Sequence, residues 1–189
     1  VAVVTVITFF FSIFSDLGIG AAIIQNKELQ QKDLNQLFSF TVWSGCILTL
    51  LFFLCSWPIS FFYKEPSMRT ITQLLAINLF FASANIVPNA LLYKAKAFKF
   101  LAWRSLGVQI TGGIIAILAA LGGAGLYALI INPILSSILL FIISYQKYPQ
   151  TLEMTWGIPS IRKIFKFSAY QFMFNIINYF SRNLDKLLI

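Results

Sequence analysis

The chain has 189 residues, of which 59% are hydrophobic and 11% charged, and its mean hydropathy is +0.82. Soluble domains are nearer to half apolar and a quarter charged, so this composition excludes an ordinary soluble domain and requires a lipid solvent. The basic residues behind the formal net charge of +8 lie between long apolar runs, which favours a membrane protein over one that binds nucleic acid.

The apolar runs predict transmembrane helices, because a hydrocarbon core of about 30 Å needs about 20 apolar helical residues. The first run, residues 1–24, carries one acid, Asp16. Two uncharged runs predict further spans at 34–63 and 70–93. None of these runs has the strict alternation over about ten residues that marks a strand of a membrane β-barrel.

The next uncharged run is long enough for two spans. Residues 105–146 would form a helix of about 63 Å, which is twice the bilayer core. The Gly-Gly-Ala-Gly segment at 122–125 favours a turn, so we expect a hairpin with spans at 105–121 and 126–145. A last span is predicted from about Lys166 onwards. The sequence therefore predicts an all-α integral membrane protein with a bundle of about six transmembrane helices.

Basic residues are divided unequally between the two sides of the predicted bundle. If the connections alternate across the bilayer, one side carries ten Lys and Arg and the other carries four. The positive-inside rule makes the ten-charge side cytoplasmic, and one preceding helix would then bring a full-length N-terminus to the cytoplasm. The ten residues are Lys27, Lys32, Lys94, Lys96, Lys99, Arg104, Lys147, Arg162, Lys163 and Lys166.

Polar side chains recur at helical spacing inside the predicted spans. In the last span they follow alternating spacings of three and four, and in the third span the asparagines share nearly one face of a straight helix. Such faces predict a shared hydrophilic cavity, with interhelical hydrogen bonding as the alternative. The candidate cavity residues are Asn78, Asn85 and Asn89 in the third span, and Gln171, Asn175, Asn178, Arg182 and Asp185 in the last.

Asp16 is a further candidate because a carboxylate within lipid is costly and usually functional. It could take up a proton or a sodium ion and so couple transport to an ion gradient. It could also pair with a basic residue, or lie at the interface or in helix packing. Gly18 and Gly20 follow it, so the helix could bend here.

Catalytic motifs are missing from the sequence. The chain has no His, which is the commonest general base and metal ligand, and no Walker loop for ATP. The longest predicted aqueous loop, about 146–161, is too short for a catalytic domain. We therefore expect a protein that is not an enzyme and uses no cofactor.

Three segments resemble a known family in their order and spacing. FSDLGIGAAIIQ at 14–25, IVPNALL at 86–92 and SRNLDKLLI at 181–189 are similar to signatures of the polysaccharide biosynthesis flippase family, within the multidrug/oligosaccharidyl-lipid/polysaccharide exporter superfamily. The resemblance implies a two-lobe fold of fourteen helices. Residues 1–160 would then form part of the N-terminal lobe, and 161–189 the start of the C-terminal lobe.

The resemblance also implies a function. Members of this family move oligosaccharide units linked to undecaprenyl pyrophosphate across the bacterial inner membrane, for assembly of O-antigen, capsule or exopolysaccharide. A diphosphate with several sugars cannot cross hydrocarbon unaided, and a cavity that opens alternately to each side solves this problem. By this interpretation, the asparagines bind sugar hydroxyls and Arg182 attracts the diphosphate.

Three other interpretations remain. A cation-coupled multidrug exporter of the same superfamily would confer drug resistance independently of glycan genes. A membrane-embedded glycan-assembly enzyme would need a large outer loop with catalytic Arg or His residues. A scaffold subunit without transport activity would not need polar stripes inside its spans.

Overall fold

The computed structural model describes residues 16–63, 66–154 and 157–188. Every element within these ranges is a helix, so the prediction of an all-α chain is confirmed for them. Most of the predicted first span lies outside the described residues. The elements are α2 (Ile19–Gln25), α3 (Gln31–Tyr63), α4 (Pro66–Ala84), α5 (Ile86–Lys94), α6 (Phe98–Leu121), the 3₁₀ helix η1 (Gly125–Tyr127), α7 (Ala128–Lys147) and α8 (Ile158–Leu188).

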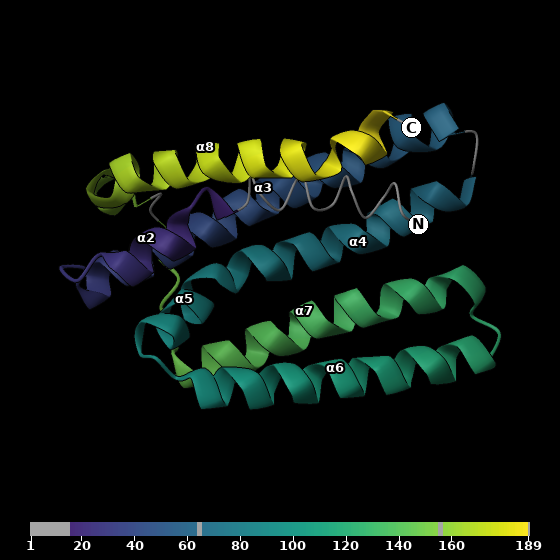
Figure 1. Ribbon diagram of the computed structural model, residues 1–189, viewed down its shortest axis with the longest axis horizontal. Helices are drawn as coiled ribbons and strands as arrows, with labels where there is room; N and C mark the ends of the chain where they lie inside the picture. Colours follow the sequence, from purple (N-terminus) through teal and green to yellow (C-terminus); the bar gives the residue numbers. More distant parts are fainter. Residues whose placement is uncertain (1–15, 64–65, 155–156, 189) are drawn as a thin grey trace.

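The long helices lie side by side along the long axis of the molecule (Figure 1). α3 packs against α4, α4 against α7, and α7 against α6, while α8 lies along α3 and also contacts α2. The buried apolar side chains form two clusters. One joins α2 and α5 to the N-terminal half of α3 and to α8, and the other joins the C-terminal half of α3 to α4 and α7.

Three of the described helices are long and apolar enough to cross a membrane: α3, α6 and α7. The bent pair α4–α5 adds a fourth if it counts as one span. The larger number of about six spans stays a prediction. The helices α6 and α8 begin at Phe98 and Ile158, earlier than the predicted 105 and Lys166, because basic residues that interrupt an apolar run continue a helix readily.

The predicted third span is bent by 41° between α4 and α5, at Asn85. Pro88 explains the bend. A proline has no N–H to donate to the carbonyl four residues earlier, here that of Ala84, and its ring clashes with that carbonyl. The helical bonds on either side survive, since the Asn85 N–H donates to the Phe81 carbonyl at 3.0 Å and the Asn89 N–H to the Asn85 carbonyl at 2.9 Å.

The connection from α7 to α8 is attached along the N-terminal half of α3. The α3 residues that hold it recur every four positions and therefore share one helix face. This ladder of bonds fixes where α8 begins relative to α3. The bonds are Gln31 Nε2 to Gln150 Oε1 at 3.0 Å, Thr151 N to Asn35 Oδ1 at 3.3 Å, Glu153 N to Ser39 Oγ at 2.7 Å, and Trp43 Nε1 to the Glu153 carbonyl at 3.3 Å.

An ion pair between a buried carboxylate on α3 and a half-exposed lysine on α8 completes the contact between these helices. Asp33, in the first turn of α3, accepts hydrogen bonds from Lys163 at 2.8 and 2.9 Å and from Ser160 at 2.7 Å. Its second oxygen also accepts the N–H of Gln30 at 3.1 Å, which caps the N-terminus of α3. We call Asp33, Ser160 and Lys163 the α3–α8 cluster. It joins residues 130 positions apart in the sequence.

Candidate functional site

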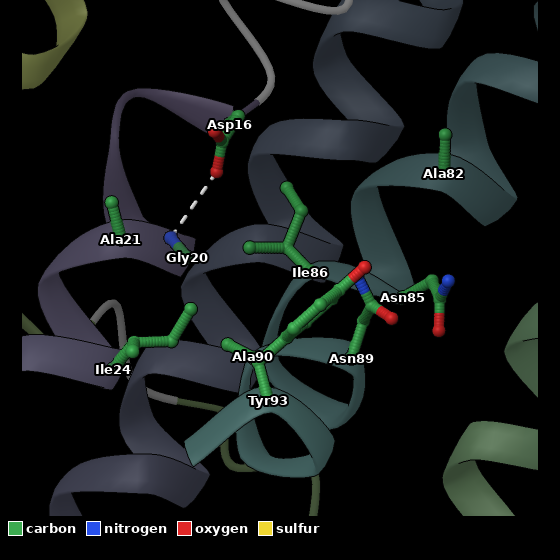
Figure 2. A pocket seen from close by; sticks show the side chains of 10 residues that line it. All are labelled: Asp16, Gly20, Ala21, Ile24, Ala82, Asn85, Ile86, Asn89, Ala90 and Tyr93. Carbon is green, nitrogen blue, oxygen red and sulfur yellow. Dashed lines mark hydrogen bonds between the residues drawn. The ribbon is translucent and has the colours of Figure 1, made fainter. Parts of the chain in front are cut away.

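A polar pocket of about 310 Å³ lies between the start of α2 and the bent pair α4–α5 (Figure 2). Its polar side chains are Asp16, Asn85, Asn89 and Tyr93, and its other walls are small or apolar residues such as Gly20 and Ala82. Three of the candidates from the sequence therefore meet in one place. They come from two separate helical segments. Periodicity within one span predicts which residues share a face of that helix, but it does not predict contacts between two helices.

Asp16 faces the pocket because the helical conformation is interrupted just after it. Leu17 and Gly18 both have positive φ, 45° and 71°, and α2 begins only at Ile19. A side chain at Gly18 would collide with α8, because its Cβ would lie 2.6 Å from the Ser168 carbonyl oxygen. One carboxylate oxygen of Asp16 accepts the N–H of Gly20 at 3.2 Å. The helix is thus broken beside Asp16, and its carboxylate faces the pocket (Figure 2).

Asn85 occupies the bend itself. Its side-chain oxygen is buried, yet no hydrogen-bond donor reaches it in the described part of the chain. A buried acceptor without a donor is costly and uncommon in native structures. Because Asn85 lines the pocket, this unsatisfied acceptor belongs to the pocket wall.

Asn89, one turn further along α5, is held by an arginine behind the pocket wall. Arg104 on α6 donates from Nη2 to Asn89 Oδ1 at 3.0 Å and from Nη1 to Ser144 Oγ on α7 at 2.5 Å. The Ser144 hydroxyl in turn donates to the Leu140 carbonyl of its own helix. We call Asn89, Arg104 and Ser144 the arginine cluster, which connects α5, α6 and α7.

Sequence reasoning missed the role of Arg104 because it assigned this residue to a cytoplasmic loop. The structure places it inside α6 and leaves only 8% of it exposed. The available signal was its position between the aromatic stretch at 98–103 and the long uncharged run at 105–146. The direction of its side chain, inwards rather than towards headgroups, is decided by α5 and α7.

The remaining candidates lie elsewhere. Asn78 is on α4 before the bend and does not line the pocket. Gln171 on α8 donates to Asn175 Oδ1 at 3.0 Å, and its side chain packs beside Gly18. Asn178 follows on the same helix and is partly exposed. The side chains of Arg182 and Asp185 lie outside the described part of the structure.

The polar side chains in the first half of α8 contact another helix. Ser168 is buried and donates to the Leu17 carbonyl at the break before α2. Next to it, Gln171 contacts the same break. These two residues attach α8 to α2, which is the interhelical alternative that the sequence left open. A cavity-lining role for Asn175 and Asn178 stays a prediction.

The apolar spans and the polar pocket at a bend between them define a helical membrane protein. Comparison with known proteins then identifies its family. The family model described as polysaccharide biosynthesis protein matches residues 1–189, and the chain belongs to this family. The resemblance noted from the three sequence segments is thereby confirmed at the level of the family.

Two curated relatives are similar over nearly the whole chain. A teichuronic acid biosynthesis protein of Bacillus subtilis is 25% identical over 186 residues, which cover 96% of this chain and 38% of the relative. An uncharacterized membrane protein in the cps region of Klebsiella pneumoniae is 23% identical over 190 residues, which cover 97% of this chain and 38% of the relative. The chain thus spans well under half the length of these relatives. No solved structure matches it significantly.

Proposed function

We propose that this chain is part of a transporter, not an enzyme, which moves lipid-linked oligosaccharide units across the bacterial inner membrane for surface polysaccharide assembly. The observation that carries the proposal is the polar pocket at the bend of a membrane-spanning helix pair, in a chain of a polysaccharide biosynthesis family. Relatives named for teichuronic acid biosynthesis and for the cps region support a glycan as cargo.

The chemistry of the pocket suits the headgroup of such a substrate. Sugar hydroxyls are donors and acceptors at once, and amide side chains offer the complementary groups. Asn85 presents a buried oxygen that lacks a donor, and Asn89 lies beside it. The polyprenyl tail stays in the bilayer while the headgroup passes through the polar path, so no sugar is transferred into hydrocarbon.

Ion coupling is a second part of the proposal. A carboxylate that faces a polar pocket inside a membrane protein can bind a proton or a sodium ion and release it on the other side. Asp16 is the acid in this position. The undecaprenyl pyrophosphate carrier, the ion and the two-lobe architecture with alternating access all belong to the proposal for the complete protein.

The test is Asn85→Leu in the complete protein in its producing bacterium. Because the Asn85 oxygen has no partner among the described residues, its removal breaks no hydrogen bond that they make, and expression should stay normal. Glycan export falls about five- to hundredfold, which corresponds to one buried hydrogen bond to the substrate.

The control is Gln109→Leu, which removes an exposed amide on α6 that lines no described pocket. Export should then equal that of the wild type. Unchanged export in Asn85→Leu, at equal protein level, would contradict the proposed role of the pocket. Drug resistance that depends on the protein, with normal surface glycan after its deletion, would instead favour a multidrug exporter.

A further inference from the structure

Arg104 is unusual among the described basic residues because it alone is buried. The neighbouring cations Lys96, Lys99 and Lys147 are exposed. Lys and Arg near the end of a membrane helix normally extend their charged groups towards the headgroups and water. Arg104 points the other way, between α5 and α7, although it lies only in the second turn of α6.

The charge of Arg104 is not neutralised by any carboxylate in the described part of the chain. Its two hydrogen-bond partners, the Asn89 amide oxygen and the Ser144 hydroxyl, are both neutral. Its Nε–H is buried and meets no acceptor among the described residues. A buried charge without a counter-charge is strongly unfavourable, and two neutral hydrogen bonds could be made by a neutral side chain. The guanidinium charge is therefore available to a group from outside the described residues.

The pocket is where such a group can approach. Asn89 and Tyr93 line the pocket (Figure 2), and Asn89 is bonded directly to the guanidinium of Arg104. An anion against this wall is attracted by the positive charge behind Asn89 through a medium of low dielectric constant. It can also replace Asn89 as the acceptor for Nη2.

We propose that Arg104 and Asn89 form an anion subsite of the pocket that binds a phosphate group. This inference rests on the proposed function and deepens it, because it assigns the charged part of a lipid-linked glycan to a particular wall. A guanidinium is suited to phosphate oxygens because it offers several donors in one plane. Phosphate could also arrive as a free ion, and the experiment below separates the two sources.

Asp16 opposes this subsite from the other side of the same pocket. A carboxylate and a phosphate repel each other there, so phosphate binding is stronger when the carboxylate is neutral. Substitution of the two charged residues should thus act in opposite directions. A purely structural role for both residues would not produce opposite signs in binding.

The experiment measures binding to the complete protein, purified in detergent, by ligand-induced thermal stabilisation. The probes are undecaprenyl diphosphate, inorganic pyrophosphate and the uncharged undecaprenol. We expect Arg104→Gln, which can still donate to Asn89, to bind undecaprenyl diphosphate about tenfold more weakly. Asp16→Asn should bind it about tenfold more tightly, and neither variant should change the response to undecaprenol.

Each result has a defined meaning. Equal diphosphate affinity in the wild type and Arg104→Gln overturns the anion subsite but leaves the proposed transport function intact. A response to inorganic pyrophosphate alone, lost in Arg104→Gln, supports the subsite and contradicts a lipid-linked substrate. If Arg104→Gln does not fold, Asp16→Asn decides: unchanged or weaker diphosphate binding in that variant overturns the proposal.

Discussion

The α3–α8 cluster and the arginine cluster each bury one charged side chain, but they treat its charge differently. Asp33 and Arg104 are 5% and 8% exposed. The carboxylate of Asp33 meets a lysine, a serine hydroxyl and a backbone N–H, so both of its oxygens are bonded. Within residues 16–63, 66–154 and 157–188, the guanidinium of Arg104 meets two neutral oxygens, and one of its buried N–H groups has no acceptor.

This difference indicates that the α3–α8 cluster attaches two helices to each other and that the arginine cluster has a different role. A buried charge that is fully paired and hydrogen-bonded holds two helices together, because removal of its partner leaves it unpaired in a medium of low dielectric constant. A buried charge that is left unpaired costs free energy and persists only where something else requires it. The two clusters therefore make opposite predictions for substitution, and both can be measured as thermal unfolding of the complete protein in detergent.

The largest stability loss is expected for Asp33→Ala. This change removes the acceptor for Lys163, Ser160 and the cap of α3 together, and should cost about 2–4 kcal/mol. The matched control is Glu28→Ala, which removes an exposed acid five positions earlier. If both variants unfolded at the same temperature, the α3–α8 cluster would not be an attachment point.

A smaller loss is expected for Gly157→Ala, just before α8. Gly157 has φ of +59°, and a Cβ here would lie 2.7 Å from the Gln36 carbonyl oxygen of α3. Strain and displacement together should cost about 2–3 kcal/mol. Gly123→Ala is the control, because Gly123 also has positive φ, +88°, but nothing within 4 Å, so only about 1 kcal/mol is expected. Equal losses would show that contact with α3 is unimportant.

The smallest changes in stability are expected for substitution of the two basic residues, Lys163 and Arg104. Lys163→Met should cost about 1 kcal/mol, since the lysine side chain is 53% exposed and Asp33 keeps its other donors. Arg104→Gln should leave stability within about 1 kcal/mol of the wild type or raise it, because an unpaired buried charge disappears. A loss for Arg104→Gln larger than that for Lys163→Met would reverse the comparison and make the arginine cluster a structural contact.

The candidate site could be predicted from the sequence only in part. The spacing of Asn85 and Asn89 predicted that they share a helix face, and in the structure both line the pocket. Asn78 was grouped with them on the assumption of a straight helix, but the 41° bend separates it from the other two. Pro88 was visible in the sequence, yet a proline alone does not predict how far a membrane helix bends, since neighbouring helices limit the bend.

Arg104 shows the opposite case. A charge next to an apolar run usually marks the end of a span, so the sequence indicated a cytoplasmic loop residue. Only the packing of α5 and α7 against α6 directs the guanidinium inwards, through the bonds to Asn89 and Ser144. Asp33 was likewise unremarkable in the sequence, because its partner Lys163 is 130 residues away.

The sequence by itself determined that the chain belongs in a lipid bilayer, that it is helical, and which family it resembles. Burial of apolar residues in lipid and formation of helix hydrogen bonds depend on residues that are close in the chain, so composition and periodicity suffice for them. The tertiary structure alone decided which charges are paired and which polar groups meet. These contacts depend on long-range packing, which brings Asp16 to Asn85 and Asn89 and, among the residues that the structure describes, leaves Arg104 without a counter-charge.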